Sequence, residues 1–159
     1  MFSKPVAQHK WLQKLVGTWA YDSEMPGEPG KPALKCSGTE SVRSVGGLWV
    51  VGEGRGEMPG GGDATMLITL GYDAAKKRFV GSWVGSMMAN MWVYEGVLKG
   101  NTLTLNTEGP DCFGKSKKPV KYRDTITITG RNTRTLSSSM PGKGGKWITF
   151  MTAKYTRVK

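Results

Sequence analysis

The stretch F79-V-G-S-W-V-G-S-M-M-A-N-M-W-V-Y-E-G96 predicts two short β-strands joined by a turn. Phe79 and Trp83 are separated by an even number of positions, so their side chains share one face of the first strand. Trp92 and Tyr94 share a face of the second strand for the same reason. Each of these rings buries roughly 150–250 Å² when it leaves water. The stretch therefore predicts either a packed core or the wall of a pocket.

The same period of two extends in both directions from this stretch. Apolar residues alternate with polar ones in these sets: Trp19/Tyr21, Cys36/Gly38/Glu40/Val42, Trp49/Val51, Met66/Ile68/Leu70, Leu103/Leu105, Tyr122/Asp124/Ile126/Ile128 and Met151/Ala153/Tyr155. Turn signals separate them: Pro26-Gly27, Gly46-Gly47, Pro59 to Gly62, Tyr72-Asp73, Gly100-Asn101, Gly130 and Pro141-Gly142. The pattern predicts about nine or ten short strands between residues 17 and 157.

Only the N-terminus has a helical pattern. Trp11, Leu12 and Leu15 fall at helical spacing, and Ser3 and Pro5 suit the cap and the first turn of a helix. We expect a short helix over about residues 4–16, followed by strands alone. A meander of this many antiparallel strands either splits into a sandwich or closes on itself.

Closure is favoured by a Gly-x-Trp pattern, in which glycine permits close backbone approach and bending. It occurs at Gly17-Thr-Trp19, Gly47-Leu-Trp49, Gly81-Ser-Trp83 and Gly145-Lys-Trp147. The expected fold is all-β: a single antiparallel up-and-down β-barrel with a short N-terminal helix. It occupies residues 1–159 as one domain.

Longer runs of sequence resemble a known family. These are W11-L-Q-K-L-V-G-T-W19, K35-C-S-G-T-E-S-V-R-S-V-G-G-L-W-V50, G54-R-G-E-M-P-G-G-G62, L70-G-Y-D73, F79-V-G-S-W-V-G-S-M-M88 and W92-V-Y94. They resemble the bacterial domain-of-unknown-function family numbered 1579, which is grouped with the calycin (lipocalin-like) β-barrels and has no established activity. The resemblance implies that Trp19 closes one end of the barrel and that Arg157 or Lys154 packs across it.

Charge and cysteine content bear on partners and compartment. The net charge is +11, and the main cluster is Lys115, Lys117, Lys118 and Lys121 beside a proline. No aromatic residue interleaves this cluster as base stacking would need, so we expect a solvated basic surface and no nucleic-acid partner. Cys36 and Cys112 lack metal-site spacing and are expected to be free thiols in a reducing compartment. With no apolar run of ~20 residues and no secretory signal, the sequence predicts a cytoplasmic protein without a membrane span.

The interior is expected to hold a cavity. Methionines gather at the presumed rim, glycines leave room beside the aromatic rings, and three carboxylates fall in phase with apolar residues. The candidate ligand-binding residues are Trp49, Met66, Trp83, Met87, Met88, Trp92, Tyr94, Glu40, Glu53, Tyr122 and Asp124. A solid core with the carboxylates at the barrel ends is the alternative.

These residues predict non-catalytic binding of a small hydrophobic or amphipathic molecule. One alternative is an enzyme in which Glu40, Glu53 or Asp124 divide acid and base roles. The other is an interaction module that acts through its basic surface. The single histidine, His9, is expected at the surface, so we assign no catalytic residue, no metal site and no particular cofactor. Both a monomer and a homodimer paired through an edge strand fit the pattern.

Overall fold

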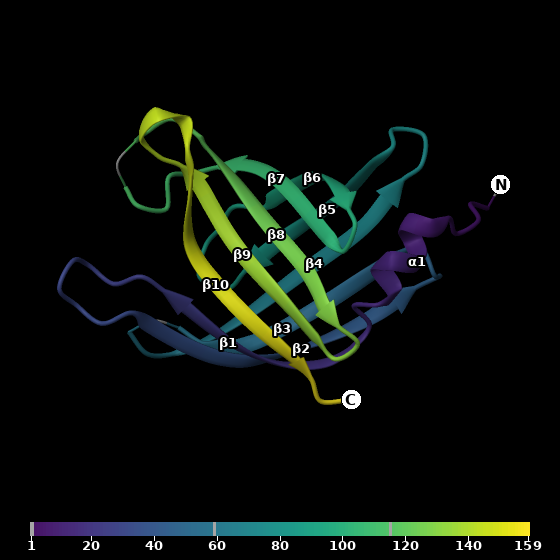
Figure 1. Ribbon diagram of the computed structural model, residues 1–159, viewed down its shortest axis with the longest axis horizontal. Helices are drawn as coiled ribbons and strands as arrows, with labels where there is room; N and C mark the ends of the chain where they lie inside the picture. Colours follow the sequence, from purple (N-terminus) through teal and green to yellow (C-terminus); the bar gives the residue numbers. More distant parts are fainter. Residues whose placement is uncertain (1, 59, 115) are drawn as a thin grey trace.

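A computed structural model describes residues 2–58, 60–114 and 116–159 (Figure 1). Lys115 of the basic cluster and Pro59 of one turn signal lie outside these residues. The elements in chain order are α1 (Ala7–Gln13), β1 (Gly17–Met25), β2 (Leu34–Val45), β3 (Trp49–Glu57), β4 (Asp63–Asp73), β5 (Arg78–Gly85), β6 (Trp92–Lys99), β7 (Thr102–Gly109), β8 (Val120–Gly130), β9 (Thr133–Pro141), a 3₁₀ turn η1 (Lys143–Gly145) and β10 (Trp147–Arg157).

The strands form one closed antiparallel barrel. Each strand pairs with the next along the chain, and β10 returns to pair with β1, with Tyr21 opposite Tyr155 at the seam. The predicted all-β, up-and-down barrel is therefore confirmed. Closure leaves no unpaired edge strand among the described residues. In the same part of the chain, no helix has both the length and the apolar character that crossing a membrane requires.

The helix is shorter than the sequence pattern predicts. It begins at Ala7 rather than near residue 4, and Val6 is its N-cap in place of Ser3. The backbone N–H of Val6 donates to His9 Nδ1 over 3.0 Å, and His9 Nε2 donates to the carbonyl oxygen of Tyr72 over 2.9 Å. With 4% of its surface exposed, His9 is buried, so the expected surface position is wrong. The histidine ties the start of α1 to the barrel.

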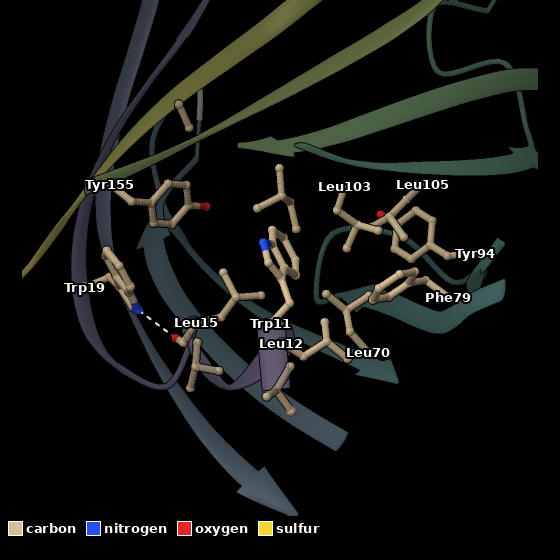
Figure 2. Close-up of a cluster of buried hydrophobic side chains, with 14 residues drawn as sticks. Trp11, Leu12, Leu15, Trp19, Leu70, Phe79, Tyr94, Leu103, Leu105 and Tyr155 are labelled. Carbon is tan, nitrogen blue, oxygen red and sulfur yellow. Dashed lines mark hydrogen bonds between the residues drawn. The ribbon is translucent and has the colours of Figure 1, made fainter. Parts of the chain in front are cut away.

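The helix closes one end of the barrel, which we call the closed end. A cluster of buried apolar side chains fills this end (Figure 2). Leu12 of α1 is fully buried, as are Leu103 and Leu105 of β7. Trp11 meets the ring of Phe79 edge to face, with their centroids 6.3 Å apart. The main apolar core therefore lies beneath the helix.

Trp19 and Arg157 seal the seam beside the helix. The indole N–H of Trp19 donates to the carbonyl oxygen of Leu15 over 2.9 Å (Figure 2). Arg157 lies over the Trp19 ring, with its guanidinium carbon 4.2 Å from the ring centroid, and donates to the carbonyl oxygens of Val16 and Lys14. Of the two expected partners of Trp19, it is thus Arg157 that packs across the ring. Lys154 is exposed, because it alternates with the inward-facing Ala153 and Tyr155.

Candidate functional site

A cavity of about 390 Å³ occupies the barrel between the helix-covered end and the opposite end, which we call the open end. Its floor includes Leu15, which follows α1, and Leu70 of β4, both from the buried cluster. Its lining also includes Leu34, Met87 and Cys112, which are exposed residues of the open end. The cavity therefore reaches solvent on the side away from the helix.

Most of the residues expected to bind a ligand meet at this cavity. Those that line it are Glu40, Met66, Trp83, Met87, Met88, Trp92, Tyr94, Tyr122 and Asp124. They come from β2, β4, β5, β6, β8 and the β5–β6 connection. The barrel thus brings together side chains that are up to 84 positions apart, from Glu40 to Asp124.

Trp49 and Glu53 lie on the outer face, and the expectation that they line the cavity is wrong. On β3 the inward positions are Val50, Gly52 and Gly54, so the alternation carries both residues outward. The Trp49 ring covers the backbone of Gly71 on the neighbouring strand, and Glu53 pairs with Arg55 across 3.6 Å. A large aromatic ring usually marks the inward face of a strand, but the Trp49 ring lies on the outward face of β3.

The cavity has a sulfur-rich lining that the sequence pattern did not identify. Besides the three expected methionines, the thioethers of Met25, Met58 and Met151 line it, as do the thiols Cys36 and Cys112. Both cysteines are free. Met25 shares the inward phase of Tyr21 on β1, so extending the phase of that strand would have found it. Thioether chains adapt to apolar partners of varied shape, which suits a site for a flexible or variable ligand.

One wall of the cavity is aromatic. The ring of Trp83 lies over Gly85, and the ring of Trp92 lies over Gly109. The indole N–H of Trp92 points to Met88 Sδ at 3.0 Å, and the Trp92 ring meets Tyr122 edge to face at 5.2 Å. Glycine at the two covered positions lets the rings lie against the backbone, because an added Cβ would fall within 3 Å of ring atoms. The rings are thereby fixed in orientation.

Glycine occupies most of the inward positions of β3, and we call this stretch the bare wall of β3. Gly52, Gly54 and Gly56 face inward on β3, and Gly38 faces inward next to them on β2. The Tyr21 hydroxyl takes the space over Gly56, where an added Cβ would stand 2.1 Å from its oxygen. Above Gly54 the neighbouring group is the flexible end of Met66. Gly52 and Gly54 therefore line the cavity with backbone alone.

The floor holds a buried ion pair. Arg134 donates to a carboxylate oxygen of Glu40, and its guanidinium group lies between the rings of Trp19 and Tyr155, at 4.6 and 3.8 Å. Burial raises the pKa of Tyr155, so it remains a neutral phenol beside the pair. Because Glu40 is engaged with Arg134, it is a supporting group in the wall rather than a free acid or base.

Asp124 is the other carboxyl of the cavity, and its environment differs. The Tyr94 hydroxyl donates to Oδ2 at 2.5 Å, and the Ser138 hydroxyl donates to Oδ1 at 2.6 Å. No ion pair joins it to a basic group in the described part of the chain. Burial raises the pKa of Asp124, although the two hydrogen bonds act in the opposite direction. Burial and the neighbouring carboxylate also raise the pKa of Tyr94 well above its usual range.

A third hydroxyl group completes a polar strip across four strands. Thr107 stands opposite Tyr122 on neighbouring strands, and its Oγ1 is buried without a hydrogen-bond partner among the described residues. Tyr94, Thr107, Asp124 and Ser138 lie on β6, β7, β8 and β9 in turn, and all four line the cavity. A buried hydroxyl without a partner costs roughly 1–3 kcal/mol. A ligand that offers it a donor or acceptor would recover that cost.

Solved structures resemble this fold across nearly the whole chain. The crystal structure of Rv2717c from M. tuberculosis is 12% identical, with a TM-score of 0.62, and the match covers 98% of this chain and 100% of that one. A redesigned β-barrel, mFAP0, bound to DFHBI, is 14% identical, with a TM-score of 0.51 and coverages of 91% and 100%. EF1p2_mFAP2b bound to DFHBI is 13% identical, with a TM-score of 0.52 and coverages of 95% and 99%. At these identities, the likeness establishes the barrel fold alone.

Sequence comparison provides the family. No curated protein matches the chain at a significant level. The family described as "Protein of unknown function (DUF1579)" matches residues 4–157, nearly the full length of the chain. The long runs around Trp11, Trp49 and Trp83 fall within this match. The chain therefore belongs to the DUF1579 family.

Proposed function

We propose that the protein binds a small, largely apolar molecule in the barrel cavity. The observation that carries the proposal is the cavity itself: about 390 Å³, lined mainly by apolar and sulfur-bearing side chains and open at one end. Pockets that bind small ligands typically measure about 300–1,000 Å³ and combine apolar walls with a few polar groups. A core that only stabilised the fold would be filled to the density of an organic crystal.

The polar strip indicates what else the ligand carries. Asp124 already accepts two hydrogen bonds, whereas Thr107 Oγ1 has none in the described part of the chain. We infer that the ligand is amphipathic and directs one polar group to Thr107 and Asp124. Its apolar body would lie between the rings of Trp83 and Trp92 and the bare wall of β3.

One further observation supports this proposal, and another bears on the compartment. Barrels of the same fold, mFAP0 and EF1p2_mFAP2b, are bound to DFHBI, so the architecture accommodates a small ligand. The thiols of Cys36 and Cys112 are free in a cavity that reaches solvent, which favours a reducing compartment such as the cytoplasm.

The test is native mass spectrometry of gently purified protein, with a denaturing run of the same sample beside it. We expect an added mass that denaturation removes. We would then titrate ligand-free protein with the amphipathic fluorophore 1-anilinonaphthalene-8-sulfonate. Trp83→Ala should weaken its binding by about 10- to 100-fold, as expected for a lost buried aromatic side chain worth roughly 1.5–3 kcal/mol.

Trp49→Ala is the matched control, because it removes the same side chain from the outer face of the barrel. Thermal melting would establish that both variants are folded. If both variants bind the fluorophore as tightly as the parent, and native spectra contain only the bare chain, the proposal is wrong. A filled barrel that acts through its surface would then be the better description.

A further inference from the structure

The open end carries exposed apolar side chains on the β7–β8 connection and where the neighbouring β9–β10 connection enters β10. Phe113 lies in the β7–β8 connection and is 43% exposed, whereas Trp147 and Ile148 begin β10 and are 37% and 54% exposed. The two connections lie side by side at one edge of the barrel (Figure 1), and the ring of Phe113 meets that of Phe150 on β10 at 5.3 Å. Large apolar groups are thus concentrated where solvent enters the cavity.

These three side chains are held in place by their neighbours. The Arg123 guanidinium group lies 3.9 Å from the centroid of the Trp147 ring. Ile148 lies over Gly142, where an added Cβ would stand 2.1 Å from its Cδ1 atom. The chain therefore presents the groups in a defined arrangement, and groups of apolar side chains left exposed in this way mark interaction sites.

The same edge is strongly basic. Lys117, Lys118, Lys121, Lys143 and Lys146 are all exposed there. No ion pair between described residues involves any of the five. We call these five lysines, with the three apolar residues, the mouth patch. It joins positive charge to apolar side chains, and the chain as a whole carries a net charge of +11.

A row of aromatic rings connects the mouth patch with the cavity. Phe113 contacts Phe150, Phe150 contacts Tyr122 at 6.0 Å, and Tyr122 contacts Trp92 at 5.2 Å. The last three of these residues line the cavity. The Tyr122 hydroxyl also donates to the carbonyl oxygen of Pro110 and accepts from the N–H of Cys112, which holds the β7–β8 connection against the wall. A continuous row of aromatic rings therefore runs from the patch to the wall of the cavity.

We propose that the mouth patch docks the barrel, open end down, on the surface of an anionic lipid bilayer. Lysines near such a surface are attracted by its negative potential, and exposed Trp, Phe and Ile side chains insert at the boundary between headgroups and acyl chains. Single-stranded nucleic acid fits less well. One face of Trp147 is already covered by Arg123, and Ile148 offers no ring on which a base can stack. The proposal does not depend on what the cavity binds.

The test is flotation with vesicles of phosphatidylcholine alone and of equimolar phosphatidylcholine and phosphatidylserine. We expect the parent to bind only the anionic vesicles and to dissociate as salt is raised. Lys117→Gln/Lys118→Gln/Lys143→Gln/Lys146→Gln should weaken binding by nearly three orders of magnitude, since each lysine near the surface contributes roughly fivefold. The matched control, Lys10→Gln/Lys14→Gln/Lys76→Gln/Lys99→Gln, removes the same charge at the closed end and should change binding far less.

A second pair of variants tests the apolar contribution. Trp147→Ser/Ile148→Ser should weaken vesicle binding about tenfold or more, whereas Val45→Ser/Trp49→Ser, at an exposed turn of the closed end, should not. Thermal melting and fluorophore binding in the cavity serve as checks that each variant is folded. Absence of binding to anionic vesicles would overturn the proposal. So would equal losses in the two quadruple variants, or binding to a single-stranded RNA oligonucleotide in place of vesicles.

Discussion

At the scale of single residues, the stability of the barrel depends on glycines at which the backbones of neighbouring strands approach closely. Gly81 faces inward on β5, and a Cβ placed there would stand 2.1 Å from the carbonyl oxygen of Thr69 on β4. A backbone atom cannot move aside as a side chain can. We expect Gly81→Ala to lower the free energy of unfolding by about 1–3 kcal/mol, as overpacking does elsewhere.

Gly54→Ala is the control for this prediction. It also faces inward, but the atom nearest its added Cβ would be the flexible end of Met66, at 3.3 Å, and the nearest backbone atom would be at 3.8 Å. The expected change is within about 0.5 kcal/mol. Urea unfolding of both variants would measure the difference, and equal losses would contradict the argument from backbone approach.

Asp124 should make stability depend on pH. Burial raises its pKa above the ordinary value of 3.8, so the folded protein binds this proton more tightly than the unfolded chain. The contribution is favourable below that ordinary value and is lost as pH rises through the raised pKa. Urea unfolding from pH 4 to 8 should therefore find that Asp124→Asn gains stability relative to the parent as pH rises. A constant difference between the two proteins would refute this.

The direction in which a single side chain points is also what the sequence predicts least well. Period-two alternation identifies two faces of a strand but does not say which faces inward. On β5 the aromatic Trp83 lies inside, whereas on β3 the glycines lie inside and Trp49 outside. Only the register against neighbouring strands decides between the two phases. His9 has a different cause: its neighbours in sequence are polar, but its contact in space is the carbonyl oxygen of Tyr72, 63 positions away.

At the scale of elements, α1 is held by Arg157 at its C-terminal end. The guanidinium group donates to the carbonyl oxygens of Val16 and Lys14 while it covers Trp19. Arg157→Ala should lower the free energy of unfolding by about 2 kcal/mol, since charged hydrogen bonds are lost. Arg157→Lys should recover only part of it, because an ammonium group lacks the planar fork of donors.

Arg131→Ala, in the exposed β8–β9 turn, is the control for this prediction and should change stability by less than about 0.5 kcal/mol. Thermal or urea unfolding would compare the three variants. If Arg157→Ala is as stable as Arg131→Ala, the contacts of Arg157 with the end of the helix contribute nothing to the free energy of unfolding.

Strands were predicted better than the helix because their signals are local. Gly46-Gly47 and Gly100-Asn101 mark turns between strands, and their glycines have the positive φ angles that such turns need. The start of the helix was misplaced because its cap is a backbone contact to His9, not the hydroxyl of Ser3. Two of the Gly-x-Trp glycines, Gly47 and Gly145, likewise sit in turns at positive φ rather than inside a strand.

At the scale of the whole molecule, stability should be unevenly distributed. The buried cluster fills the closed end, whereas the cavity replaces it toward the open end. On the β7–β8 pair, amide exchange near Leu103 and Ile126 should be at least about tenfold slower than near Thr107 and Tyr122. Hydrogen exchange followed by mass spectrometry would measure this. Uniform protection along the two strands would contradict a difference in stability between the closed end and the open end.

Closure of the barrel could be predicted because the number of strands and the short turns that join them can be read from the sequence. The cavity could be anticipated only as an alternative to a solid core, since it depends on how side-chain volumes add up across neighbouring strands. The polar strip shows the difference: the phase of its strand identifies Asp124, and the phase of Leu103 and Leu105 extends to Thr107, whereas no alternation pattern marks Ser138.

The bare wall of β3 has a consequence for how this family can diversify. Where a cavity is hollowed out by absent side chains, its size can change one methyl group at a time while the strands that form it stay paired. Among the inward glycines of β3, Gly54 has the most room, because an added Cβ would stand 3.3 Å from the flexible end of Met66 and 3.8 Å from the nearest backbone atom. Proteins descended from one barrel could thus keep the same fold and differ in the size of the ligand that they bind, through substitutions at a single glycine.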